Sequence, residues 1–333
     1  MRRLIATGYG EPDRVLTVAD LPDDPPPGPG QVRIAVTAVG LNFLDVMLCR
    51  GEYPVRPSPP FTPGVELAGR VVATGAGAEA LAWADVVACP TLPDGALGET
   101  VTVDAALAVP RPSDIDPVVA AAVPVTYQTA WFALDRAGVH AGDTVLVHAG
   151  AGGVGIAATQ LARARGARVI CTAGGPAKTA LCRDNGADVA VDYLAGDFVA
   201  AVRDATGGAG VDVVVDPVGG DVFTRSLDCL AVDGRLVAVG AAGGNPPPVD
   251  PMRLIAGNHT LIGLSWGSTY PWARPDAVAQ AYQRIFDLIR AGAVRPPVNR
   301  VVDLAGTPAA LADLADRRTT GKIIVRIDPR EST

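Results

Sequence analysis

Residues 144–166 read TVLVHAGAGGVGIAATQLARARG. The strand-like run Thr144–His148 leads directly into a glycine-rich turn and then into a helical pattern. Gly150, Gly152 and Gly155 have GxGxxG spacing, which permits a tight turn, close approach of the backbone to a pyrophosphate, and close helix packing. The N–H groups at the start of the following helix favour an anion. This context predicts dinucleotide binding, with a purely structural glycine turn as the alternative.

The sequence around this stretch alternates between strand and helix. Such alternation predicts right-handed crossovers and a parallel sheet covered on both faces, with ligands outside the carboxyl ends of the strands. Helical patterns lie between most strands, notably Gly153–Arg165 and Lys178–Asn185. The six predicted strands are Thr144–His148, Arg168–Thr172, Asp188–Asp192, Val211–Asp216, Arg235–Gly240 and Thr260–Leu264.

The first 120 residues have a different texture, with short β-rich runs separated by proline and glycine. These runs (Gln31–Val39, Gly64–Thr74 and Asp85–Cys89) predict a small antiparallel β domain. After residue 265 we expect an aromatic loop, a helix at 276–291, a short strand, a helix at 308–316 and a final strand, 322–327. This tail is too small to fold alone. The predicted domains are therefore 1–123, 124–264, and a segment, 265–333, that returns to complete the first domain.

The composition excludes several classes of protein. The chain has 333 residues, is 49% hydrophobic and has a net charge of −7, with no basic tract. Disorder, nucleic-acid binding and anionic membranes are therefore disfavoured. The longest apolar run, Val118–Val125, is too short to span a bilayer. Five scattered cysteines without a CxxC pair support neither a zinc site nor a disulfide framework. We expect a soluble, cytoplasmic protein.

The residues after the second predicted strand bear on the choice of cofactor. NAD-specific sites place Asp or Glu there to hold the ribose 2′-hydroxyl, but residues 171–178 read CTAGGPAK, without a carboxylate. Lys178 would instead attract a 2′-phosphate by a charge-assisted hydrogen bond. It is one of only two lysines among the 28 basic residues. These features favour NADPH over NADH, the alternative being that Lys178 is a solvated residue in the first turn of a helix.

Several further segments resemble the zinc-independent quinone oxidoreductase (zeta-crystallin-like) family of the medium-chain dehydrogenase/reductase superfamily. They span almost the whole chain. In order they are GLNFLDVMLCRGEYP (40–54), PFTPGVELAGRV (60–71), HAGAGGVG (148–155), RVICTAGGPAK (168–178), DVVVDPVGG (212–220), GRLVAVG (234–240) and RRTTGKIIV (317–325). The resemblance implies an α/β protein with a GroES-like β domain and a Rossmann domain with a doubly wound, six-stranded parallel sheet, holding the cofactor in the cleft between the domains.

The resemblance also implies which residues bind the cofactor. Asn42 and Thr129 would lie near the nicotinamide. The pyrophosphate would be cradled by Gly152, Gly153 and Val154, and the adenosine and its phosphate would be surrounded by Gly174, Lys178 and Tyr193. Val218, Gly240 and Leu264 would line the rest of the cofactor, and Arg317 could reach the phosphate region.

The zinc enzymes of the superfamily have ligands that this chain lacks. Their catalytic cysteine would fall in the segment 40–45, which reads GLNFLD, and their histidine falls at Val65. Without a Lewis acid to polarise an alcohol, the site suits substrates that are already electrophilic. We therefore expect NADPH-dependent reduction of a quinone. The alternatives are an enone or enoyl-thioester reductase and a non-catalytic NADPH-binding sensor or scaffold.

The catalytic candidates are Asn42, Tyr53 and Thr129. Tyr53 could donate a hydrogen bond to a substrate oxygen, or simply pack at a loop edge. Asn42 could hold the nicotinamide ribose or a substrate oxygen, or cap a turn. We expect Asp45 to stabilise the following helix and His148 to be structural.

Three further expectations concern aromatic residues and assembly. Tyr127 could face the cleft or belong to the core. The aromatic loop Trp266–Trp272 could cover the substrate or form a subunit contact. The last Rossmann strand, Thr260–Leu264, should be an apolar edge, which invites pairing with another chain. Because family members are typically dimers through this edge, we predict a homodimer.

Overall fold

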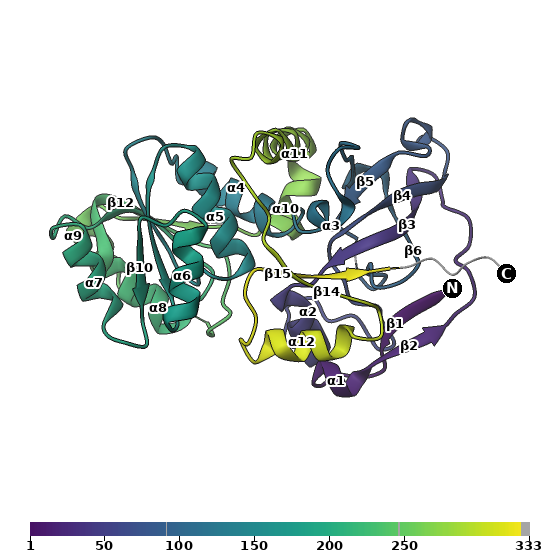
Figure 1. Cartoon of the computed structure of the whole chain (residues 1–333), viewed down its shortest axis with the longest axis horizontal. Helices are drawn as coiled ribbons and strands as arrows, with labels where there is room; N and C mark the ends of the chain where they lie inside the picture. Colours follow the sequence, from purple (N-terminus) through teal and green to yellow (C-terminus); the bar gives the residue numbers. More distant parts are fainter. Residues whose placement is uncertain (91, 246, 328–333) are drawn as a thin grey trace. The chain divides into compact units, whose positions relative to one another are not determined.

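The structure, a computed structural model, describes residues 1–90, 92–245 and 247–327 (Figure 1). The chain forms two compact units. Unit 1 contains Met1–Val125, Pro271–Phe286 and the chain from Pro296 onward, and unit 2 contains Thr126–Tyr270 and Asp287–Arg295. The last part of the chain is therefore divided between the two units, with Asp287–Arg295 in unit 2.

Unit 2 is built on a six-stranded sheet in the order β10-β9-β8-β11-β12-β13, in which every neighbouring pair is parallel. Its strands are β8 (Thr144–Val147), β9 (Arg168–Ala173), β10 (Val189–Asp192), β11 (Val211–Asp216), β12 (Leu230–Ala238) and β13 (Thr260–Gly263). This is the doubly wound arrangement that the alternating pattern predicts. The predicted fold class is confirmed.

Helices cover both faces of this sheet. The connections α5 (Gly153–Ala164) and α6 (Pro176–Asp184) lie on one side, and α7 (Phe198–Ala205) and α9 (Pro251–Gly257) on the other (Figure 1). Unit 2 also contains α4 (Thr126–Arg136), α8 (Gly220–Ser226) and the short 3₁₀ helix η3 (Leu227–Cys229). Strands β8, β9 and β11 are nearly continuous buried runs, as is usual where both faces of a parallel sheet are covered. In α5, eight successive residues from Gly155 to Ala162 are buried.

The glycine-rich turn follows β8, which lies beside β11 where the strand order reverses. From β8 the chain winds outward through β9 to β10, and then returns to β11 on the other side of β8. Ligands of such sheets bind at this switch point, outside the carboxyl ends of the strands. The topology thus directs attention to the turn at Ala149–Gly155.

Unit 1 contains a seven-stranded sheet in the order β14-β15-β3-β4-β5-β7, with β6 paired to β3, and a separate hairpin of β1 and β2. All pairs are antiparallel except β14 with β15. The strands are β1 (Arg2–Ala6), β2 (Leu16–Asp20), β3 (Gln31–Gly40), β4 (Leu67–Thr74), β5 (Asp85–Ala88), β6 (Thr100–Asp104), β7 (Ala108–Pro110), β14 (Val298–Val302) and β15 (Lys322–Arg326). In β3 burial alternates along most of the strand, as expected when one face packs on a core.

The helices of unit 1 are short, apart from α11, whose last residues belong to unit 2. They are α1 (Pro12–Val15), α2 (Phe43–Arg50), α3 (Pro117–Ala120) and α12 (Thr307–Ala315), with the 3₁₀ helices η1 (Glu79–Leu81) and η2 (Ala105–Leu107). In α11 (Pro275–Arg290) the buried residues are Val278, Ala281, Tyr282, Ile285 and Phe286. This spacing gives the apolar stripe of an amphipathic helix.

The prediction of an aromatic loop at Trp266–Trp272 was wrong, because these residues belong to the helix α10 (Trp266–Ala273). Pro271 lies inside that helix, and together with Gly267 it makes the local sequence look like a loop. Packing against the rest of the protein nevertheless stabilises the helix. Trp266 is buried, and the rings of Tyr270 and Phe132 lie 4.3 Å apart. Tertiary contacts thus override weak local helix propensity.

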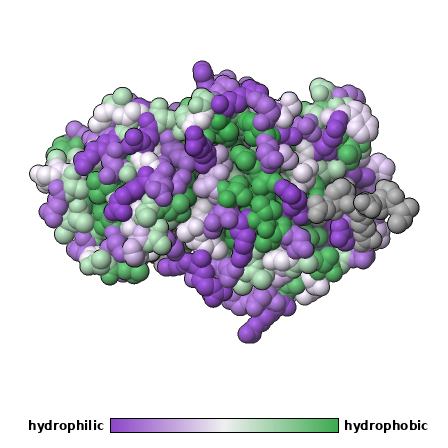
Figure 2. All heavy atoms as spheres, viewed as in Figure 1, coloured by the Kyte–Doolittle hydropathy of each residue, from purple (hydrophilic) through white to green (hydrophobic). Residues whose placement is uncertain are grey.

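Hydrophilic residues are distributed across the face in view in Figure 2, interrupted by smaller apolar areas. No helix in the described part of the chain is both long enough and apolar enough to cross a bilayer.

Candidate functional site

The predicted cofactor residues of unit 2 gather at one edge of its sheet. Because all six strands are parallel, the segments that follow them emerge at the same edge. The segments after β8, β9, β10, β11, β12 and β13 supply Gly152, Gly153, Val154, Gly174, Lys178, Tyr193, Val218, Gly240 and Leu264. The structure therefore brings these nine residues together at one edge of the sheet of unit 2, whereas Asn42 and Arg317 belong to unit 1.

The glycine turn is built without room for side chains at two positions. A Cβ on Gly155 would lie 2.2 Å from the carbonyl oxygen of Ala149, and a Cβ on Gly150 would lie 2.9 Å from the sulfur atoms of both Cys171 and Cys182. Ala149 itself has a φ of +50°. These contacts show that the turn is tightly packed against the strand and helix beneath it.

The start of α5 offers unpaired donors. Gly152 is the N-cap residue and has no side chain to cap the helix. Within the described residues, the backbone N–H groups of Gly153 and Val154 have no hydrogen-bond acceptor. Unpaired N–H groups at the positive end of a twelve-residue helix form a suitable cradle for phosphate oxygens.

The adenosine end of the predicted site lies beside β9 and β10. Gly174 follows β9, and a Cβ there would lie 2.7 Å from the hydroxyl oxygen of Tyr193. Lys178 is half-buried in the first turn of α6, and 45% of Tyr193 is exposed. Sequence reasoning missed Asp192, which pairs with Ala173 across the two strands. Its Oδ1 accepts hydrogen bonds from the N–H groups of Gly175 and Leu194, at 2.8 and 3.0 Å.

The remaining predicted cofactor residues follow β11, β12 and β13. Asp216, at the end of β11, holds the next turn by accepting from the N–H of Val218 at 2.7 Å. Burial raises the pKa of Asp216, and this backbone hydrogen bond opposes the shift. Gly240 is exposed and Val218 is half-buried, whereas Leu264 is buried and its N–H donates to Ala238.

Unit 1 contains a buried polar cluster, which we call the Glu66 cluster: Asn42, Asp45, Glu66 and Lys322. Asp45 and Glu66 are fully buried, Lys322 is 2% exposed and Asn42 is 8% exposed. Nζ of Lys322 donates to Oε1 of Glu66 at 2.5 Å and to Oδ1 of Asn42 at 2.9 Å. The other carboxylate oxygen of Glu66 accepts from the N–H of Val125 at 2.7 Å. The cluster is therefore internally hydrogen-bonded and nearly closed to solvent.

Sequence reasoning found Asn42 and Asp45 in this cluster but missed Glu66 and Lys322. A signal for Glu66 exists, because it is the only ionisable residue in the otherwise apolar run Pro63–Gly69. Such a residue is buried only when it is paired. Its partner could not be identified from the sequence, because Lys322 lies 256 residues away.

Asp45 is the N3 residue of α2, as expected of a residue that stabilises that helix. Its carboxylate accepts from the N–H groups of Asn42 and Gly64, both at 2.9 Å. Burial raises the pKa of Asp45 to about 6, although these two hydrogen bonds and the ammonium of Lys322 oppose the shift. Nδ2 of Asn42 donates to Glu66 at 2.8 Å and to the carbonyl of Gly40 at 3.2 Å.

Tyr53 and Thr129, the other two catalytic candidates, belong to different units. Tyr53 follows α2 in unit 1 and packs, half-buried, against the hydrophobic core of that unit. Burial raises the pKa of its phenol, so the hydroxyl remains protonated and able to donate. Thr129 is half-buried on α4 of unit 2. Arg317 is exposed and follows α12, with a φ of +56°.

Two further residues lie in the core of unit 2. Tyr127 is fully buried, and its hydroxyl donates to Oε1 of Gln160 at 2.8 Å. Both ring nitrogens of His148 are hydrogen-bonded, to the hydroxyls of Thr172 and Ser226, each at 2.8 Å. Burial lowers the pKa of His148 to about 3, so the imidazole is neutral. These contacts support a structural role for both residues.

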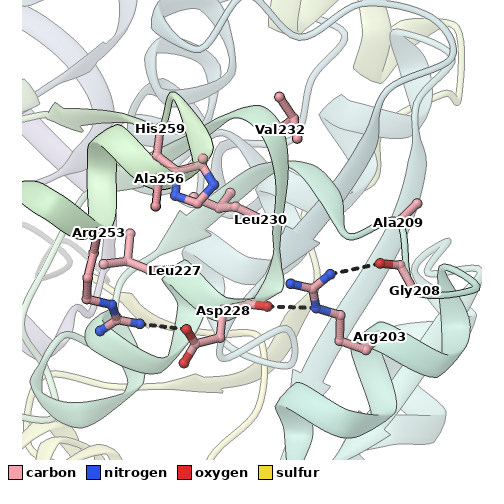
Figure 3. Close-up of a pocket in the computed structure, with 11 residues that line it drawn as sticks. Arg203, Gly208, Ala209, Leu227, Asp228, Leu230, Val232, Arg253, Ala256 and His259 are labelled. Atoms are coloured by element: carbon pink, nitrogen blue, oxygen red, sulfur yellow. Dashed lines mark hydrogen bonds and ion pairs between the residues drawn. The ribbon is translucent and has the colours of Figure 1, made fainter.

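Unit 2 also has a surface pocket of about 480 Å³, which contains none of the predicted site residues (Figure 3). Arg203, Asp228 and Arg253 border it, and Arg253 pairs with Asp228 at 2.6 Å. Its lining residues Ala209, Leu230 and His259 lie at the starts of β11, β12 and β13. The pocket therefore lies at the amino ends of the strands, opposite to the glycine turn.

The described part of the chain offers few ligands for a metal ion. Among the described residues, no group of three or more His, Cys, Asp and Glu side chains is placed to hold a metal ion. The segment Gly40–Asp45 and Val65 supply no thiolate or imidazole. The ammonium of Lys322 instead pairs with Glu66, and a divalent cation beside it would be repelled. These residues do not fit a zinc ion.

Comparison with known proteins gives matches over both units. The family described as alcohol dehydrogenase GroES-like domain matches residues 28–113, and that described as zinc-binding dehydrogenase matches residues 153–285. The mouse protein named quinone oxidoreductase-like protein 2 is 35% identical over 305 residues, covering 91% of this chain and 86% of the mouse protein.

Solved structures also match along nearly the whole chain. Escherichia coli quinone oxidoreductase, in complex with NADPH, has 30% identity and a TM-score of 0.91, covering 98% of this chain and 100% of that chain. A 2-haloacrylate reductase has 31% identity and a TM-score of 0.86, covering 99% of this chain and 100% of that chain. Proteins with this fold are therefore named for two different substrates, a quinone and a 2-haloacrylate.

Proposed function

Because the chain belongs to the zinc-independent quinone oxidoreductase-like family of medium-chain dehydrogenases/reductases and is an oxidoreductase, we propose that it reduces a quinone with NADPH. The observation that supports this most strongly is the convergence of six strand ends around the glycine turn of unit 2. That edge offers unpaired N–H groups, a lysine and a tyrosine to one extended, phosphorylated ligand.

NADPH fits the residues at this edge. The N–H groups of Gly153 and Val154 would hold the pyrophosphate, and Lys178 with Tyr193 would hold the 2′-phosphate. The nearby carboxylate of Asp192 already accepts two backbone N–H groups, which reduces its repulsion of a phosphate. Gly152, Gly174, Val218, Gly240 and Leu264 would line the cofactor, and Arg317 would contact a phosphate. When bound, NADPH supplies the hydride.

The protein's own contribution would be orientation and exclusion of water rather than strong acid–base chemistry. A quinone accepts hydride readily because the product regains aromaticity. Tyr53 would donate a hydrogen bond to the quinone oxygen, since burial keeps its phenol protonated. Asn42 and Thr129 would position the nicotinamide. His148 is buried and hydrogen-bonded through both ring nitrogens to the hydroxyls of Thr172 and Ser226, which favours a structural role.

A second candidate substrate is a conjugated carbonyl compound, such as an enone or an enoyl thioester. The similarity to a 2-haloacrylate reductase favours it, since a haloacrylate has a carbon–carbon double bond conjugated to a carboxylate. Such a reaction needs a proton donor near the α-carbon, and Tyr53 would take that role. A non-catalytic NADPH-binding sensor is the third candidate.

We also propose a homodimer that pairs through β13. This strand is at the edge of the sheet, and Leu261 within it is 36% exposed. Nearby in the chain, Val232, Met252 and Ile255 are each more than 60% exposed. An open strand edge with exposed apolar residues favours pairing with a second copy.

The test is turnover of the purified protein with NADPH against benzoquinones and naphthoquinones, enones, and enoyl-coenzyme A esters. The proposal predicts that kcat/KM is highest for a quinone. Faster reduction of an enone or enoyl ester would support the second candidate. NADPH binding without oxidation by any acceptor would support the sensor.

A further inference from the structure

The orientation of the Asn42 side-chain amide is fixed by two buried ionic partners. Nδ2 has two hydrogens, and they are directed at Oε1 of Glu66 and at the carbonyl of Gly40, at 2.8 and 3.2 Å. Oδ1 accepts from Nζ of Lys322 at 2.9 Å. Turning the amide over would place its oxygen against the Glu66 carboxylate and its N–H groups against the ammonium. Charge therefore permits one orientation only.

This orientation determines what Asn42 can offer a ligand. Both hydrogens of Nδ2 are occupied, whereas an amide oxygen has two lone pairs and Lys322 uses one of them. Asn42 can thus accept a hydrogen bond from a hydroxyl but has no hydrogen left to donate to a carbonyl. Of the two possible partners of Asn42, the ribose hydroxyl is therefore favoured over a substrate oxygen.

Lys322 has the chemistry that this position requires. An ammonium has three hydrogens, and Nζ has three acceptors: the carbonyl of Leu41 at 2.8 Å, Oδ1 of Asn42 at 2.9 Å and Oε1 of Glu66 at 2.5 Å. An arginine would bring five donors in a planar fork to a space with three acceptors. The side chains of Lys322 and Glu66 are 3% and 0% exposed, so water cannot replace either partner.

We propose that Lys322 and Glu66 are positioning residues, which hold the Asn42 amide so that its oxygen accepts from the nicotinamide ribose of the bound cofactor. This inference rests on the proposed function, in which Asn42 contacts that part of NADPH. Neither Lys322 nor Glu66 touches the cofactor. Their effect on binding passes through Asn42.

The test compares the Kd of a ligand that contains the nicotinamide half of NADPH with the Kd of a ligand that lacks it. The main variant is Lys322→Met with Glu66→Gln, because Lys322→Met alone leaves a buried carboxylate without its cation and could fail to fold. Kd for NADPH should rise about tenfold, the loss of one hydrogen bond. Kd for adenosine 2′,5′-bisphosphate, which lacks the nicotinamide riboside, should not change. Fluorescence titration measures both, and circular dichroism confirms folding.

A double-mutant cycle with Asn42→Ala separates positioning from general structure. If Lys322 and Glu66 act through Asn42, the double substitution causes no further rise in the Kd for NADPH when Asn42→Ala is already present. The matched control is Arg3→Met, which removes another buried cation of unit 1, paired with Asp24 at 2.7 Å. This control should leave both dissociation constants unchanged.

Three results would overturn the proposal. The first is a rise in the Kd for NADPH that is additive across the cycle, and the second is an equal rise in the Kd values of NADPH and the bisphosphate. The third is a crystal structure of the double variant in which the Asn42 amide keeps its wild-type orientation. Failure of the proposed function gives a different pattern. A wild-type protein that binds NADPH but reduces no quinone refutes only the quinone substrate, and the binding cycle still decides the roles of Lys322 and Glu66. A wild-type protein that does not bind NADPH refutes both.

Discussion

Replacing Asp45 with asparagine should change how the stability of the protein depends on pH. Asp45 is fully buried, and burial raises the pKa of its carboxyl from 3.8 to about 6. In the unfolded chain the pKa returns to the lower value. Between these two values the folded protein binds more protons than the unfolded one, so the contribution of Asp45 to stability falls as the pH rises. Above pH 6 the contribution levels off.

The size of the effect follows from the two pKa values. One pKa unit corresponds to about 1.4 kcal/mol, and the shift of Asp45 spans roughly two units. Protonating Asp45 should therefore stabilise the wild-type protein, relative to Asp45→Asn, by about 1.4 kcal/mol when the pH falls from 7 to 5. The ionised carboxylate accepts two backbone N–H groups, so the variant also loses a hydrogen bond, but that loss does not depend on pH.

Urea unfolding of both proteins from pH 4.5 to 8 measures this difference. Other carboxyl groups change the stability of both proteins alike, so the difference between the two curves isolates Asp45. Titration of its ¹³Cγ chemical shift provides an independent check, with a midpoint expected near pH 6. A difference that stays constant between pH 5 and 7, or that changes in the opposite direction, would refute the assignment of burial as the dominant cause.

Three further predictions concern the cofactor and the metal. Lys178→Ala should raise the Kd for NADPH about tenfold to a hundredfold more than the Kd for NADH, measured by fluorescence titration; equal losses would remove Lys178 from the 2′-phosphate site. Gly155→Ala places a Cβ 2.2 Å from the carbonyl of Ala149 and should cost about 1–3 kcal/mol of stability and weaken NADPH binding. Gly196→Ala, where a Cβ meets nothing within 4 Å, should do neither, and a similar loss in both would contradict the steric argument. Dialysis against EDTA should leave the reductase rate unchanged; activity that is lost and then restored by zinc would show that a metal takes part.

The strand–helix order was readable from the sequence because each element of unit 2 has a strong local pattern. Val211–Asp216 was predicted without error, and the other strands differ mainly at their ends. The start of β12 was placed five residues too late, at Arg235 instead of Leu230, because the Asp233–Gly234 pair within this stretch is typical of a turn. Asp233 in this stretch has a φ of +61°, which is unusual for a residue within a strand.

The two candidate sites differ in how much the sequence alone could reveal, and the sheets explain why. In the parallel sheet of unit 2, the end of every strand lies at the same edge, so strand ends that are far apart in sequence fall together without any knowledge of register. No such rule predicts the Glu66 cluster of unit 1. It requires that the chain before α2, the start of β4 and the start of β15 meet, and this depends on the pairing of β3 with both β4 and β15.

Register in antiparallel sheets is set by side-chain packing and turn geometry, neither of which relates Glu66 to Lys322 in the sequence. What the sequence does show is a mismatch: an ionisable residue in an apolar run, and a lysine at the start of the apolar strand Lys322–Arg326. Each residue alone would be costly to bury. A chain that buries both residues reduces this cost by pairing them. Two ionisable residues of opposite charge in apolar segments therefore predict a contact between them, which neither periodicity nor motif spacing predicts.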